Sequence, residues 1–205
     1  MAPPRVRRYL DAEVAFVRER VRPGDRVLEL GCGYGRVLAK FAPAARVVVG
    51  VDTSLASLAS GRRELAAAAN VRWLAMDALR LGFRPRAFDV VACIQNGISA
   101  FHVPWGELVA EALRVTKAGG RTLFSSYTAA FWPERLAWFE AQAAAALVGE
   151  LDRERTRPGF IVCKDGFTGA TASADEFLAL AAAAGAAARV VEVNGSSLFC
   201  EMTPA

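Results

Sequence analysis

Three glycines and an acidic residue near the start of the chain could hold a charged ligand. The stretch VLELGCGYG, Val27–Gly35, places Gly31, Gly33 and Gly35 directly after an apolar run. Glycine has no Cβ and tolerates positive φ, so a ligand can approach the backbone closely. Glu29 lies inside the apolar run, where a carboxylate is costly without a partner. This spacing predicts a turn that contacts a ligand.

A second acidic residue indicates which kind of ligand the turn would bind. Asp52 ends the apolar segment RVVVGVD, about 20 residues after the first glycine, where an acid can bind both hydroxyls of a ribose. The fingerprint for dinucleotides requires a third glycine at the position that Arg36 occupies. The pattern therefore favours a nucleoside-bearing ligand and argues against a nicotinamide-dependent oxidoreductase.

These residues lie at the ends of segments that alternate between strand and helix. One helix is predicted over Gly35–Phe41, and a second begins after a cap at Thr53 or Ser54. A third, with an apolar stripe, is predicted to end at Ala118–Gly120. Such alternation implies parallel strands joined by right-handed crossovers, with helices on both faces. The five short apolar runs predicted as buried strands are Arg26–Gly31, Arg46–Asp52, Val71–Met76, Phe88–Ile94 and Arg121–Tyr127.

The end of the chain departs from this alternation. A helix is predicted over Phe131–Val148, followed by a hairpin around Asp165-Gly166. Ser173–Glu176 has the pattern of a capping box that opens the last helix. Two final strands are separated only by Asn194-Gly195, and such a short link forces antiparallel pairing.

The stretch ELGCGYG resembles the first motif of the class I S-adenosylmethionine-dependent methyltransferases. The resemblance covers essentially the whole chain through VGVDTS, AMDAL, FDVVACIQN, the KAGG turn and the terminal hairpin. It implies an α/β fold: a Rossmann-like, seven-stranded methyltransferase sheet, mostly parallel, with a C-terminal antiparallel hairpin and helices on both faces. It also implies one domain over residues 1–205, with S-adenosylmethionine as cofactor and S-adenosylhomocysteine as product.

The resemblance assigns roles to individual residues. Glu29 would orient the loop and reach the methionine ammonium, Asp52 would take the ribose hydroxyls, and Asp77 would accept from the adenine amino group. Gln95 or Asn96 would lie beside the methionyl end. Asp77 and Asn96 also suit plain turns, so that alternative stays open. The cofactor-binding residues expected in full are Glu29, Gly31, Cys32, Gly33, Tyr34, Gly35, Asp52, Thr53, Met76, Asp77, Ala78, Gln95 and Asn96.

The residues that would bind or activate the methyl acceptor are indicated less clearly by the sequence. His102 follows the fourth strand, and its ordinary pKa would suit a general base, although a helix cap explains it as well. Residues 1–24 are expected to form an N-terminal helix and candidate lid, and residues 155–172 a hairpin insertion that could cap the substrate. Ordinary helix packing competes with a substrate pocket as the reason for the aromatic residues. The candidate substrate-binding residues are Tyr9, Phe101, Trp105, Tyr127 and Trp132.

Composition limits the function classes. The chain has 205 residues, is 54% hydrophobic and carries a formal charge of +4. The apolar runs are shorter than a membrane span needs, and we expect a cytoplasmic protein without a membrane partner. Four scattered cysteines and one histidine argue against a metal. The pattern for nucleic-acid amino methylation is absent, which argues against a nucleic-acid partner, and either a monomer or a homodimer is expected.

The leading hypothesis is methyl transfer from S-adenosylmethionine to a small-molecule acceptor. The alternative is a non-catalytic S-adenosylmethionine-binding protein, such as a sensor or an assembly subunit. An aminopropyl transferase on the same fold would need an acid-rich amine site, whereas the fourth strand ends in Gln95 and Asn96.

Overall fold

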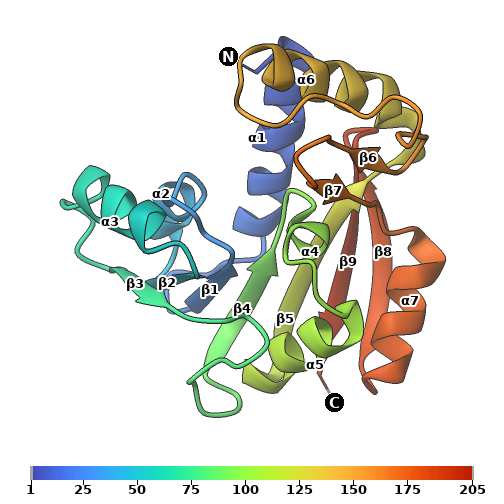
Figure 1. The fold of residues 1–205 in the computed structure, drawn as a ribbon. Helices are drawn as coiled ribbons and strands as arrows, with labels where there is room; N and C mark the ends of the chain where they lie inside the picture. The colour runs from blue at the N-terminus through green and yellow to red at the C-terminus, as the bar shows by residue number, and fades with distance from the viewer. Residues whose placement is uncertain (1, 205) are drawn as a thin grey trace.

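The computed structural model describes residues 2–204, which form a seven-stranded sheet with a smaller two-stranded sheet above one end (Figure 1). The large sheet has the order β3-β2-β1-β4-β5-β9-β8. The first five strands in sequence are parallel, while β9 runs antiparallel to β5 and β8 antiparallel to β9. The predicted fold class is therefore confirmed. The strands are β1 Arg26–Leu30, β2 Val47–Asp52, β3 Val71–Ala75, β4 Phe88–Cys93, β5 Thr116–Tyr127, β8 Ala187–Val193 and β9 Ser197–Thr203.

Helices cover both faces of the sheet, as the alternating pattern predicted (Figure 1). One hydrophobic core joins the strands to α5 and α7, and a second joins them to α1, α2 and α3. The strands at the centre are apolar on both faces because each face is buried by a helix layer. The helices are α1 Pro4–Arg18, α2 Leu38–Phe41, α3 Leu55–Glu64, α4 Gly97–Ala100, α5 Trp105–Val115, α6 Trp132–Ala144 and α7 Ala174–Ala183, with short 3₁₀ turns at Ala42–Ala44 and Ala129–Phe131.

Three predicted helix boundaries were wrong. The helix after the glycine turn spans only Leu38–Phe41. Helix α5 ends at Val115, before Ala118–Gly120, because the backbone becomes extended at Thr116, with φ of −82° and ψ of 135°, and leads directly into β5. The glycines instead form an irregularity inside β5, where Gly119 has φ of +72°. Helix α6 ends at Ala144, short of the predicted Val148.

The strand order reverses between β1 and β4, because the chain first builds outward from β1 to β3 and then returns to the other side of β1. A crevice forms at the carboxyl ends of strands at such a point, and ligands of open α/β sheets bind there. Above the neighbouring end of β5 lie α6 and the two-stranded sheet of β6, Ile161–Val162, and β7, Thr168–Gly169 (Figure 1). This hairpin is the one predicted around Asp165-Gly166.

Candidate functional site

The glycine turn adopts a backbone that most other residues would strain. Gly31, Gly33 and Gly35 have φ of +71°, +52° and +83°. A Cβ at Gly35 would lie 2.0 Å from the Cη2 atom of Trp73, so this glycine is required for packing within the protein. A Cβ at Gly33 would meet no atom within 4 Å. The space beside Gly33 is therefore open to a ligand.

Asp52 holds this turn in place. One carboxylate oxygen accepts a hydrogen bond from the Gly33 N–H at 2.8 Å, and the other accepts one from the Ser54 N–H at 2.8 Å. The N–H groups of Gly31 and Cys32 both donate to the Val51 carbonyl, which ties the end of β1 to the end of β2. Ser54 caps α3, one of the two caps expected from the sequence.

Two side chains beside the turn carry buried polar atoms that lack partners among residues 2–204. They are the Oε2 atom of Glu29 and the Nε2 atom of Gln95. Burial raises the pKa of Glu29 well above its usual range, Arg36 opposes that shift, and Asp52 adds to it. The Arg36 guanidinium donates to Oε1 of Gln95. The ends of β1 and β4 thus present one free acceptor and one free donor.

A cavity of about 210 Å³ opens beside these residues. Asp52 and Thr53 line one part of it, while Met76, Ala78 and Phe101 supply apolar walls. A Cβ added to Gly31 would lie 3.0 Å from the Phe101 ring, so the ring closes over the turn. Asp77 follows Met76 and accepts from the Leu79 N–H at 2.9 Å, in the turn geometry that the sequence left open.

Asn96 connects the end of β4 to the segment after β7. Its Nδ2 donates to the Ala170 carbonyl at 2.9 Å, and its Oδ1 accepts from the Ser126 hydroxyl at 2.8 Å. The same Ser126 oxygen accepts from the Ala172 N–H at 2.8 Å. Asn96 is buried and has φ of +60°, so its side chain is engaged in fixing the hairpin segment.

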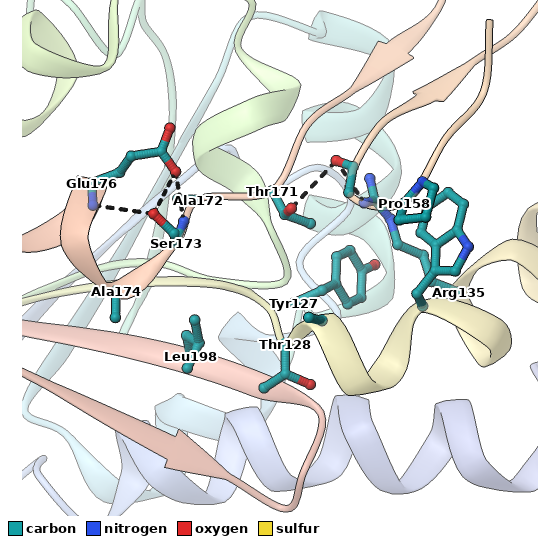
Figure 2. Close-up of a pocket in the computed structure, with 13 residues that line it drawn as sticks. Tyr127, Thr128, Arg135, Pro158, Thr171, Ala172, Ser173, Ala174, Glu176 and Leu198 are labelled. Atoms are coloured by element: carbon teal, nitrogen blue, oxygen red, sulfur yellow. Dashed lines mark hydrogen bonds between the residues drawn. The ribbon is translucent and has the colours of Figure 1, made fainter.

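A second, larger cavity of about 380 Å³ is lined by the continuation of that segment, Thr171, Ala172, Ser173 and Ala174 (Figure 2). Tyr127 and Thr128 enter it from the end of β5, and Trp132 and Arg135 enter it from α6. Ala172 and its neighbours close it from the hairpin side. Two of the predicted substrate residues, Tyr127 and Trp132, therefore line one cavity.

The remaining predicted residues are dispersed. Tyr9 is fully buried against Tyr127, with ring centroids 5.0 Å apart. Trp105 packs against the core at the start of α5. His102 is exposed, and its ring lies edge-on to Phe167 at 6.1 Å between centroids. The buried Cys32 and the half-exposed Tyr34 stay within the glycine turn, beside the residues already described.

Three residues of this region were missed by the sequence analysis: Glu13, Arg36 and Arg135. Glu13 interrupts the apolar stripe of α1 and is fully buried. Arg135 interrupts the aromatic residues of α6 at helical spacing and is 1% exposed. A charge within an apolar helical stripe is a readable signal, since such a group needs a buried partner.

None of the helices in residues 2–204 is both long enough and apolar enough to span a bilayer. No grouping of three or more His, Cys, Asp or Glu side chains in the same residues is arranged to hold a metal ion. All four thiols are free and buried.

Known proteins resemble the cofactor half of the chain most clearly. A family described as a methyltransferase domain matches residues 27–120. A demethylmenaquinone methyltransferase of Renibacterium salmoninarum is 34% identical over 119 residues, which are 58% of this chain and 48% of that protein. A ubiquinone biosynthesis O-methyltransferase of Pseudomonas fluorescens is 34% identical over 117 residues, covering 55% and 49%. The chain thus spans about half the length of these curated relatives.

The similarity in fold to solved structures extends over nearly the whole chain. A solved structure of an S-adenosylmethionine-dependent methyltransferase from Methanosarcina mazei has a TM-score of 0.68 and 14% identity, over 92% of this chain and 97% of that one. Four features indicate the same family: the glycine turn, the acid at the end of β2, the strand order and the matched domain. Residues 27–120 thus match a methyltransferase domain, and the chain as a whole has the fold of the S-adenosylmethionine-dependent methyltransferases.

Proposed function

We propose that this chain transfers a methyl group from S-adenosylmethionine to a small-molecule acceptor. One observation carries the proposal: the Gly33 N–H donates to Asp52 at 2.8 Å, which brings a ligand-accessible turn and a carboxylate to one cavity of about 210 Å³. That pairing is what a nucleoside ligand requires, because its ribose needs acceptors and its polar tail needs close contact with the backbone.

The residues present fit the cofactor. Each oxygen of Asp52 accepts one backbone N–H and keeps lone-pair capacity for the ribose hydroxyls. Oε2 of Glu29 is a free acceptor for the methionine ammonium group, and Nε2 of Gln95 is a free donor for the methionine carboxylate. Both atoms are buried, so a partner would relieve the penalty of leaving them unpaired.

The adenine end would lie against the apolar walls of the smaller cavity. Met76, Ala78 and Phe101 provide surfaces for a flat ring. Asp77, between the lining residues Met76 and Ala78, is the proposed acceptor for the adenine amino group. One of its carboxylate oxygens also accepts from the Leu79 N–H. The carboxylate has further acceptor capacity for such a bond.

When bound, S-adenosylmethionine supplies a methyl group on a sulfonium sulfur, which keeps the electron pair of the broken bond while the acceptor's lone pair takes the carbon. The protein contributes alignment and exclusion of water. An acceptor that must lose a proton needs a base, and His102 is our candidate. It follows Phe101 of the smaller cavity and contacts Phe167 of the hairpin.

The acceptor site would be the larger cavity, whose lining begins at Tyr127 and so lies outside the matched residues 27–120. The relatives named above are methyltransferases of demethylmenaquinone and of ubiquinone biosynthesis, which supports a small molecule as acceptor here. We also propose a cytoplasmic location without a nucleic-acid partner, as a monomer or homodimer. Four free, buried thiols are consistent with a reducing compartment.

Calorimetry with S-adenosylmethionine, S-adenosylhomocysteine and NAD tests the cofactor. We expect both sulfur compounds to bind and NAD to give no heat; tight NAD binding without a response to the sulfur compounds would overturn the assignment. Transfer of isotope-labelled methyl groups to a panel of small acceptors then tests the reaction. Cofactor binding with no labelled product from any acceptor would favour the non-catalytic alternative.

A further inference from the structure

Arg135 is a buried cation with an incomplete set of partners. Its side chain is 1% exposed. Nη2 donates to the Gly169 carbonyl at 2.7 Å, and Nη1 lies 3.4 Å from the Gly159 carbonyl. The Nε–H group is buried and has no acceptor among the residues that the structure describes. The guanidinium therefore retains a donor that the fold leaves unused.

No carboxylate of residues 2–204 forms an ion pair with Arg135. Its neighbours are aromatic faces: the Tyr127 ring centroid lies 4.7 Å from the guanidinium carbon, and those of Trp132 and Phe139 lie at 5.9 and 5.8 Å. Aromatic rings offset only part of the cost of burying a cation, and an opposite charge within hydrogen-bond distance offsets more.

The acidic side chain in the wall of this cavity already has hydrogen-bond partners. Glu176 lines the same cavity, but its Oε2 atom accepts from both the N–H and the hydroxyl of Ser173 at 2.8 and 2.7 Å. Figure 2 shows Glu176 and Ser173 on the opposite side of the cavity from Tyr127 and Arg135. The open volume between them is about 380 Å³.

We propose that Arg135 binds the carboxylate of the methyl acceptor, so that the acceptor is a small carboxylic acid with an apolar, aromatic body. The acid would complete the donors of the guanidinium, which is shaped to bind carboxylates. The half-buried ring of Trp132 lines the cavity and offers a surface for an aromatic ring. The identification as acceptor rests on the proposed methyl transfer; the carboxylate is the recognition group, and methylation occurs elsewhere on the molecule.

The wall of the larger cavity is hydrogen-bonded to the end of β4, where the cofactor's methionyl end is proposed to lie. Ala172 lines the cavity, and its N–H donates to Ser126, which in turn donates to Asn96. Asn96 directly follows Gln95, whose Nε2 is free. Hydrogen bonds therefore connect the wall of the larger cavity to the end of β4.

The test compares acids with their neutral amides: benzoate with benzamide, and phenylacetate with phenylacetamide. Protein labelled with ¹⁵N is titrated in the presence of saturating S-adenosylhomocysteine, and the Nε–H resonance of Arg135 is followed, assigned by its loss in Arg135→Lys. We expect each acid to shift this resonance and to bind about tenfold or more tightly than its amide, because hydrogen bonds to charged groups are the stronger ones.

Three variants complete the test. Arg135→Gln should abolish the preference for acids. Ala174→Phe fills the cavity without altering the guanidinium and should abolish acid binding. This variant keeps the proposal testable if Arg135→Gln does not fold. Arg157→Gln is the matched control, because Arg157 also stacks on an aromatic ring, Phe160 at 4.9 Å, but is exposed and outside the cavity lining. Its acid preference should equal that of the wild type.

Equal binding of acids and amides, or no binding of either acid, would overturn the proposal. A second result would also overturn it: S-adenosylhomocysteine displaces the acids and, when added alone, shifts the Arg135 resonance. The partner of Arg135 would then be the cofactor's own carboxylate. Failure of the cofactor assignment gives a different result: acids bind and Arg135 responds, while calorimetry detects no S-adenosylhomocysteine binding.

Discussion

The carboxylate of Glu13 accepts a 2.5 Å hydrogen bond from the backbone N–H of Gln95, 82 positions away in the sequence. It also accepts from the hydroxyls of Ser125 and Ser197 at 2.8 and 2.7 Å. One buried side chain thus ties α1 to the ends of β4 and β5 and to the start of β9. Gln95 has φ of +61°, so this bond helps to hold a strained residue beside the cofactor site.

This arrangement predicts a pH-dependent stability. Burial raises the pKa of Glu13 from 4.5 to about 7, against the opposing effect of hydrogen bonds that include those from Ser197, Ser125 and the Gln95 backbone. Between these values the folded state holds a proton that the unfolded state has released. The free energy of unfolding should therefore fall as pH rises from 4.5 to about 7, by on the order of 3 kcal/mol, and the Glu13 contribution should be constant above.

Urea unfolding at several pH values between 4.5 and 8 measures this dependence. Glu13→Gln should remove the Glu13 part of it and leave the part that Glu29 adds in the same direction, since the pKa of Glu29 is also raised by burial. Glu19→Gln is the control, because Glu19 lies at the end of the same helix with a side chain that is 74% exposed. A wild-type slope retained in Glu13→Gln would contradict the prediction.

The glycine turn predicts two different outcomes for the same substitution. Gly35→Ala drives a methyl group to within 2.0 Å of Trp73 and should lower the free energy of unfolding by about 1–3 kcal/mol or more, the range for overpacking. Gly33→Ala meets no protein atom within 4 Å, so its loss should be limited to the strain of positive φ, about 1 kcal/mol.

Binding should follow the opposite order. The methyl group in Gly33→Ala projects into the open space beside the turn, and S-adenosylhomocysteine affinity should fall about tenfold or more while the protein stays folded. Urea unfolding and calorimetry on the same samples separate the two effects. Unchanged affinity in Gly33→Ala would show that the ligand does not pass over this glycine.

Asp52→Ala should weaken S-adenosylhomocysteine binding by roughly tenfold or more, because two hydrogen bonds to a charged group are lost, each typically about 1.5–3 kcal/mol when formed. Asp52 also fixes the N–H groups of Gly33 and Ser54, so the affinity and the unfolding free energy must both be measured. Asp25→Ala is a matched control, since Asp25 accepts the Arg22 N–H at 2.8 Å far from the cavity. An unchanged dissociation constant in Asp52→Ala would place the ribose elsewhere.

The fold could be predicted from the sequence because its signals are local and repeated. Short apolar runs ending in glycine or an acid gave five parallel strands, and Asn194-Gly195 gave the final hairpin. The boundary errors lie at element ends, where the pattern is weakest: the backbone becomes extended at Thr116 and begins β5 there, before the glycines are reached.

The site could be predicted only in its cofactor half, where spacing along the chain sets the arrangement. Gly33 and Asp52 meet because adjacent parallel strands end at one edge. The larger cavity depends on how α6 and the hairpin pack over β5, which no spacing reveals. Arg135 contacts Gly169, 34 positions away, and only the tertiary structure shows that its buried Nε–H has no acceptor.

The proposal that residues 1–24 act as a lid gives the final prediction. The first half of α1 packs through Tyr9 against Tyr127 and Phe131, with ring centroids at 5.0 and 5.2 Å, and Tyr127 lines the larger cavity. The second half is anchored by Glu13 and by Phe16, whose ring stacks on Phe199 at 4.1 Å. A lid built this way should tighten in its first half. Amide hydrogen exchange across residues 5–12 should therefore slow when S-adenosylhomocysteine and benzoate bind together, whereas residues 13–20 should exchange slowly with or without them. If the whole helix already exchanges slowly and neither compound changes the rate, α1 is a structural element and the lid proposal is wrong.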